Sequence, residues 1–181
     1  MGANRIGMQR MSVAEQPTLF ADLPGTGLDD HDTTLTPLTL LNRLGRFDLD
    51  PCGFPGHSTA SRLICWPDDG LQKDWSGRVW LNPPYSEPAP WLERLLRHGD
   101  GIALVLASTD TKWFHDYVAK ATGLLFIRGR PLFLRDDFTE VGLMRASVFV
   151  AYGEENARRL ALSGIAGWFV SVRATGGPDG R

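Results

Sequence analysis

From Leu35 onward the chain alternates short apolar runs with segments whose apolar residues recur at helical spacing. Two of the apolar runs, Ile102–Ala107 and Leu124–Ile127, contain no polar residue, and each follows a segment with helical spacing. When strands alternate with helices along a chain, each helix carries the chain back across the sheet, so that neighbouring strands run parallel. The sequence therefore predicts an α/β fold with a compact, mostly parallel sheet. A further strand at 146–152 and a last helix at 154–164 complete the pattern.

Two earlier strands each end in a polar loop. Arg46–Asp50 stops at Pro51, and Arg78–Leu81 is followed by Asn82. In open α/β sheets, ligands bind outside the carboxyl ends of the strands. We therefore expect Asp50 and Asn82 to lie at a ligand site.

The length of 181 residues suits one domain with a substantial core. Residues 1–33 show no sustained periodicity, so we predict a flexible N-terminal tail over 1–33, a catalytic domain over 34–173 and a frayed C-terminus over 174–181. No apolar run is long enough to span a membrane. No apolar segment follows Arg5 and Arg10, so we expect a cytoplasmic protein without a secretory signal.

The formal net charge is -2, so a nucleic-acid site would have to be a local basic surface, such as the cluster of Arg128, Arg130 and Arg135. The two cysteines, Cys52 and Cys65, have neither the number nor the spacing of a disulfide framework or a zinc site. We expect reduced thiols and no bound metal.

The segment Asn82-Pro83-Pro84-Tyr85 suits the methylation of an exocyclic amine. The lone pair of such an amine is delocalised into its ring, and acceptors that bind both amine hydrogens would localise it. The side-chain oxygen of Asn82 and the carbonyl of Pro83 are two such acceptors, and consecutive prolines hold them in place. Tyr85 offers an aromatic face to a base flipped out of its duplex. The alternative is a plain proline turn, or a polyproline ligand for a WW-like partner.

Around this segment the chain resembles the phage-type Dam family of DNA N6-adenine methyltransferases, over roughly Thr36 to Tyr152. Six blocks in the family's order carry the resemblance: Thr36-Pro37, Phe47–Cys52, Asp69–Leu71 with Trp75, Val79–Ser86, Thr109–His115 and Phe126–Arg130. The resemblance implies a Rossmann-like methyltransferase fold that binds S-adenosylmethionine across the strand ends. It also implies methylation of adenine in double-stranded DNA.

The resemblance implies cofactor contacts at the ends of the early strands. The positions that match are Thr36, Pro37, Asp50, Pro51, Cys52, Gly53, Asp69 and Asn82. The strand-terminal carboxylate of Asp50 could meet the cofactor's ammonium group, although a turn or helix cap would also explain it. Thr36 before a proline could equally be a helix N-cap. The family's glycine-rich signature is incomplete, and no ribose-binding acid stands out.

Contacts with DNA are predicted on the later loops. The candidates are Ser86, Lys112, Trp113, His115, Arg128 and Arg130. The cations among them suit phosphate contacts, although a solvated charged face would explain them as well. Since no insertion is large enough for a recognition domain, sequence specificity would come from the short loops 86–90 and 135–143.

In the tail, Gln16–Phe20 resembles a peptide that docks on the bacterial sliding clamp. A motif of five residues can also arise by chance, or can serve to pack the tail against the domain. The nearest alternative activities are methylation of RNA or of a protein amide. An alternative outside the class of enzymes is a catalytically silent DNA-binding or clamp-associated protein.

Overall fold

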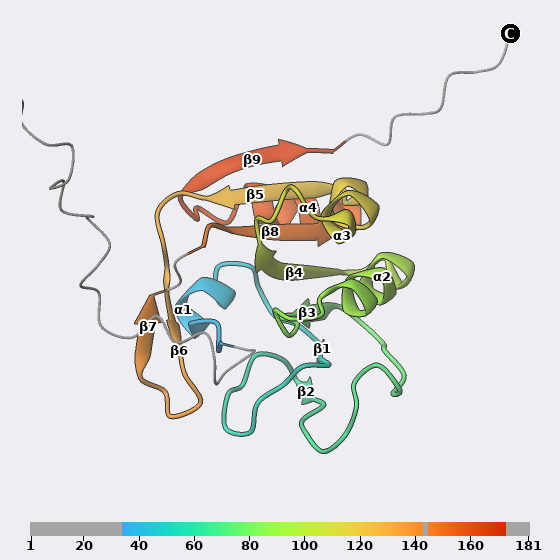
Figure 1. The fold of residues 1–181 in the computed structure, drawn as a ribbon, viewed down its shortest axis with the longest axis vertical. Helices are drawn as coiled ribbons and strands as arrows, with labels where there is room; N and C mark the ends of the chain where they lie inside the picture. Colours follow the sequence, from blue (N-terminus) through green and yellow to red (C-terminus); the bar gives the residue numbers. More distant parts are fainter. Residues whose placement is uncertain (1–33, 143–144, 173–181) are drawn as a thin grey trace, which may run out of the picture.

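A computed structural model describes residues 34–142 and 145–172 (Figure 1). The expected tail with its clamp-like peptide, and the C-terminus from 174, lie outside these residues. The elements, in chain order, are α1 (Leu38–Leu41), β1 (Leu49–Asp50), β2 (Arg62–Leu63), β3 (Val79–Leu81), α2 (Ala89–His98), β4 (Gly101–Leu106), α3 (Lys112–Asp116), the 3-10 helix η1 (Val118–Lys120), β5 (Gly123–Ile127), β6 (Leu132–Leu134), β7 (Glu140–Gly142), β8 (Ser147–Tyr152), α4 (Glu154–Ala161) and β9 (Gly167–Ser171).

Seven strands form one sheet in the order β2-β1-β3-β4-β8-β5-β9, which Figure 1 shows from bottom to top. The four strands β2, β1, β3 and β4 are parallel neighbours. β8 lies antiparallel between β4 and β5, and β9 is antiparallel to β5. Five of the strands therefore share one direction, and only β8 and β9 are reversed. The α/β fold is confirmed, and its parallel part is the half that carries Asp50 and Asn82.

Both faces of the sheet are covered, which explains why its central strands are apolar throughout. On one face, Leu92 and Leu95 of α2 pack with Phe114 of α3. On the other face, Leu41 of α1 packs with Leu160 of α4. All six residues of β4 and all six of β8 are buried, as expected for strands without a solvent face.

The main departures from the expected elements are short or exposed strands. β2 has two residues, and β6 and β7 have three each, so none of these strands is long enough for periodicity to detect. β9 is an edge strand with three exposed residues. The helix after Pro37 has only four residues, Leu38–Leu41.

Candidate active site

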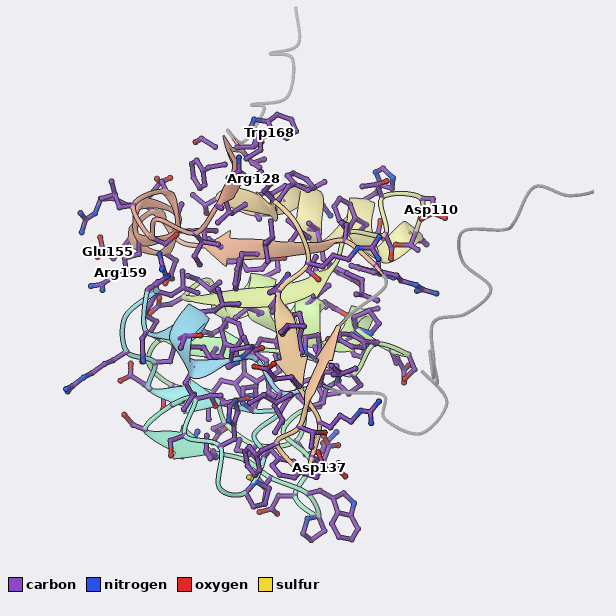
Figure 2. The ribbon with its side chains drawn as sticks, turned by 90° about the vertical axis from the view of Figure 1, so that its left-hand side faces the viewer. Asp110, Arg128, Asp137, Glu155, Arg159 and Trp168 are labelled. Carbon is purple, nitrogen blue, oxygen red and sulfur yellow. The ribbon has the colours of Figure 1, made fainter. Side chains whose placement is uncertain are left out.

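The carboxyl ends of β1 and β3 bring Asp50 and Asn82 to the same edge of the sheet, because Leu49 of β1 pairs in parallel with Val79 of β3. Figure 2 looks onto this edge, toward which β4 and β5 point in Figure 1. Two cavities open here, one lined by Asn82 and the other by Pro83 and Tyr85. The four residues Asn82-Pro83-Pro84-Tyr85 therefore stand between them.

The first cavity, which we call the polar cavity, has a volume of about 180 Å³. Its walls are Thr34, Leu35, Thr36, Asp50, Cys52, Gly53, Phe54, His57, Thr59, Trp66, Trp80 and Asn82. Five of the eight residues predicted on the cofactor side are in this set. The other three, Pro37, Pro51 and Asp69, do not line it.

Asp50 is buried at the floor of the polar cavity, and two groups donate hydrogen bonds to its carboxylate. The hydroxyl of Thr59 donates to Oδ2, and the backbone N–H of Cys52 donates to Oδ1 over 2.9 Å. Burial raises the pKa of Asp50 from its ordinary 3.8 to about 6, against the opposing effect of these two hydrogen bonds. The carboxylate is therefore mainly ionised at neutral pH, and no cation among the described residues pairs with it.

Two other oxygens of this cavity are buried without a hydrogen-bond partner among the described residues. These are Oδ1 of Asn82 and Oγ1 of Thr36. The amide nitrogen of Asn82 donates to the carbonyl of Thr34, which fixes the side chain with its oxygen unused. Buried polar atoms are nearly always paired in folded proteins, so an unpaired one needs an explanation, and a missing ligand is one. Thr36 does not cap α1, since Pro37 occupies that position without a side-chain cap bond.

The loop that follows β1 is held by close backbone packing. A Cβ on Gly70 would lie 2.0 Å from the carbonyl oxygen of Pro51, so only glycine lets the 69–72 segment approach this closely. A Cβ on Gly53 would lie 2.8 Å from Cβ of Leu63, so this glycine serves packing against β2 as well as the cavity. Asp69 is exposed, and its carboxylate accepts the N–H of Leu71 over 2.8 Å. Burial raises the pKa of the Cys52 thiol, and the charges of Asp50 and Asp69 raise it further.

The β6–β7 hairpin packs against the outer part of the polar cavity. The ring of Phe138, at the turn of the hairpin, lies 6.1 Å from the ring of Phe54 and 6.1 Å from that of His57. His57 is buried, and its Nε2 lies 2.9 Å from the carbonyl of Thr36, to which it donates as an N–H. Burial lowers the pKa of His57. A neutral imidazole is therefore part of this wall.

The second cavity, which we call the aromatic cavity, has a volume of about 210 Å³. Its walls are Pro83, Tyr85, Pro88, Val105, Leu106, Ser108, Thr111, Trp113 and Arg145. The phenol of Tyr85 is anchored by a 2.6 Å hydrogen bond to the hydroxyl of Thr34, and burial raises its pKa. Two aromatic side chains from distant parts of the chain, Tyr85 and Trp113, thus line a space that begins at Pro83, the residue after Asn82.

Of the predicted DNA contacts, Trp113 lines this cavity, and the others do not. Lys112 pairs with Asp116 one turn along α3, an interaction that lowers the pKa of the Asp116 carboxyl. His115 Nε2 lies 2.8 Å from the carbonyl of Thr109 and so holds the loop before α3. Ser86, Arg128 and Arg130 are exposed.

A larger depression of about 570 Å³ runs along α2, and none of the predicted site residues lines it. The guanidinium of Arg94 lies there, 4.9 Å from the centre of the Trp75 ring, and donates to the carbonyl of Leu71. These contacts tie α2 to the preceding loop. We assign this depression to packing between surface elements.

Sequence reasoning missed several residues of both cavities. His57 and Thr59 lie in a segment read only as a loop, and Arg145 stands outside every matched block. Their roles depend on contacts made far along the chain, such as Thr59 with Asp50. A signal was available for Thr111, because it lies in the block Thr109–His115 just after β4.

A sheet of this order, with polar and aromatic cavities at the carboxyl ends of its parallel strands, places the protein among the Rossmann-like α/β folds. The profile of the family described as DNA N-6-adenine-methyltransferase (Dam) matches residues 26–151. The chain therefore belongs to the Dam family of DNA N6-adenine methyltransferases, as the resemblance predicted.

Two phage proteins described as DNA N-6-adenine-methyltransferase are similar to this chain. That of Haemophilus phage HP1 is 33% identical over 88 residues, covering 45% of this chain and 51% of the relative. That of Escherichia phage T1 is 28% identical over 115 residues, covering 57% of this chain and 48% of the relative. The chain thus spans about half the length of the curated relatives it matches. No solved structure matches significantly. Among the described residues, no helix is long and apolar enough to cross a membrane.

Proposed function

We propose that this protein transfers a methyl group from S-adenosylmethionine to the N6 amine of a flipped adenine in double-stranded DNA. The observation that carries the proposal is the buried, unpartnered Oδ1 of Asn82, a residue of the polar cavity whose neighbour in the chain, Pro83, lines the aromatic cavity. The amine of adenine has two N–H donors, and a free acceptor beside an aromatic pocket matches that chemistry.

In this proposal the base occupies the aromatic cavity. Tyr85 and Trp113 supply ring faces against which a flipped adenine would stack. Oδ1 of Asn82 and the carbonyl of Pro83 would accept the two N6 hydrogens, which localises the nitrogen lone pair for attack on the methyl carbon. As the new N–C bond forms, the bond between that carbon and the cofactor's sulfur would break, its electron pair staying on sulfur so that S-adenosylhomocysteine leaves, and the surplus proton on N6 would pass to water.

The cofactor would occupy the polar cavity. The ionised carboxylate of Asp50 suits a ligand ammonium group, and Oγ1 of Thr36 is a second unused polar atom in the same wall. These two atoms fit an amino-acid-bearing ligand, and Asp69 would contribute charge from outside. S-adenosylmethionine would supply an electrophilic methyl group on a positively charged sulfur, so no strong base is required.

The exposed cations at this edge of the sheet would bind phosphates. Arg128 and Arg130 follow β5 at the same edge of the sheet, and Lys112 begins α3. Phosphate contacts of this kind position a duplex and do not read its sequence. Action on DNA in a bacterial host would place the protein in the cytoplasm. The clamp-like peptide Gln16–Phe20 remains a sequence prediction.

The test compares acceptor classes. The protein is incubated with tritiated S-adenosylmethionine and unmethylated DNA, RNA or protein, beside an Asn82→Ala control. We expect label in DNA only, and label confined to RNA or protein would overturn the choice of substrate. Calorimetry with S-adenosylmethionine distinguishes an active methyltransferase from a catalytically silent DNA-binding protein. The silent protein would bind DNA without binding the cofactor.

A further inference from the structure

Trp168 has an unusual place for a large aromatic side chain, since 69% of it is exposed although it belongs to a strand of the central sheet. Its ring stacks on Phe126, its partner across the β5–β9 pair, with centroids 5.6 Å apart and planes inclined by 27°. This contact fixes the orientation of the indole and leaves its outer face free. A ring ordered before binding loses little entropy when a partner covers it.

Trp168 lies at the edge of the sheet that carries the site. β9 begins there at Gly167, whose partner is Ile127 at the carboxyl end of β5. Figure 2, which looks onto this edge, shows Trp168 beside Arg128. The backbone N–H of Arg128 donates to the carbonyl of Ala166 over 2.9 Å, which ties the two segments together.

The strand order connects this corner to the aromatic cavity. Leu106 at the end of β4 and Arg145 just before β8 line the cavity, and β5 with Arg128 and then β9 with Trp168 follow outward. Three strand spacings separate β4 from β9, which amounts to roughly 14 Å. That span corresponds to about four base pairs of duplex, at about 3.4 Å for each.

We propose that Trp168 and Arg128 form a contact surface for the duplex about four base pairs away from the flipped adenine, an inference that rests on the proposed function. The indole would lie against a deoxyribose and donate its Nε1–H to a phosphate, while Arg128 would bind a neighbouring phosphate. The charge fits, because neither Arg128 nor Arg145 has an ion-pair partner within the described residues. This surface follows outward from the aromatic cavity in which the flipped base would bind, so we infer that DNA occupies it and not a second copy of this chain.

The experiment measures duplex affinity by fluorescence anisotropy with no cofactor present. The probe is a G·C duplex with one adenine opposite an abasic site, which marks the flipped position without knowledge of the recognition sequence. One flank has twelve base pairs, and the other has two or eight, in both orientations. The variants are Trp168→Ala, Trp168→Phe and Arg128→Ala, with Arg159→Ala on α4 as the matched control for an exposed arginine.

Only one of the two flanks of the adenine would reach Trp168. When that flank has eight base pairs, we expect Trp168→Ala to weaken binding about tenfold and Trp168→Phe to weaken it less. With two base pairs on that side, the effect of either variant should vanish. Arg128→Ala should reduce the slope of log affinity against log salt by about 1, whereas Trp168→Ala should leave that slope unchanged. Arg159→Ala should bind like the unaltered protein.

Unchanged affinity of Trp168→Ala for the long duplexes would overturn the inference. So would an equal loss at every flank length, because the effect would then not depend on whether the duplex reaches Trp168. A change in oligomeric state on light scattering would likewise overturn it and assign the surface to a second copy. If the unaltered protein binds no DNA, the proposed function itself fails. If it binds and methylates DNA while Trp168→Ala is neutral, only this inference fails.

Discussion

Replacing Asp50 by asparagine should stabilise the fold at neutral pH while weakening cofactor binding. Burial raises the pKa of Asp50 from 3.8 to about 6 in the folded protein. The folded state therefore binds more protons than the unfolded state between these pH values, so stability falls as the pH rises through this window. A shift of this size costs about 3 kcal/mol once both states are ionised. An amide at position 50 removes this cost, although it also weakens one of the hydrogen bonds from Thr59 and Cys52.

Urea unfolding of the unaltered protein and Asp50→Asn at several pH values measures the effect. The free energy of unfolding of the variant, relative to the unaltered protein, should rise by about 2 to 3 kcal/mol between pH 4 and pH 8. Asp137→Asn is the control of opposite sign, because hydrogen bonds from Thr139 lower the pKa of that exposed carboxyl. A difference for Asp50→Asn that does not change with pH would refute the reasoning.

The remaining predictions concern the two cavities. Thr36→Val should reduce S-adenosylmethionine affinity in calorimetry without lowering the melting temperature, because Oγ1 of Thr36 has no partner to lose; a lower melting temperature would indicate a structural hydroxyl. Tyr85→Ala should weaken capture of an adenine opposite an abasic site by about 1 to 3 kcal/mol and spare cofactor affinity, and loss of cofactor binding would make Tyr85 structural. Cofactor affinity should fall as the pH drops below about 6, where Asp50 gains its proton, and this fall should be absent in Asp50→Asn.

The sequence predicts the central strands and the edge at which the site forms. β4 and β8 are covered on both faces, so their composition alone marks them. The sequence also predicts the strand ends at Asp50 and Asn82, and the parallel pairing of β1 and β3 brings these two residues to one edge of the sheet. No helix lies between β1 and β3 in the described chain, so this pairing does not arise from the alternation of strands with helices. The residue pattern along the chain is therefore enough to locate the central strands and the strand ends that carry the site.

Features that depend on distant pairings could not be predicted. The antiparallel insertion of β8 between β4 and β5 places Arg145 at the aromatic cavity, and no local pattern signals that neighbour. The free oxygen of Asn82 is likewise visible only once Thr34 has taken up its amide nitrogen. Short strands such as β2 carry too few residues for a period to emerge.

The central claim is that the buried, unpartnered oxygen of Asn82 prepares adenine N6 for methylation. The most direct test incubates the protein with unmethylated DNA and S-adenosylmethionine that carries a deuterated methyl group, then identifies the nucleosides by mass spectrometry. The account predicts deuterated methyl on N6 of deoxyadenosine, and none with Asn82→Ala. Methyl on cytosine, or equal N6-methyladenine from the Asn82→Ala variant, would contradict it.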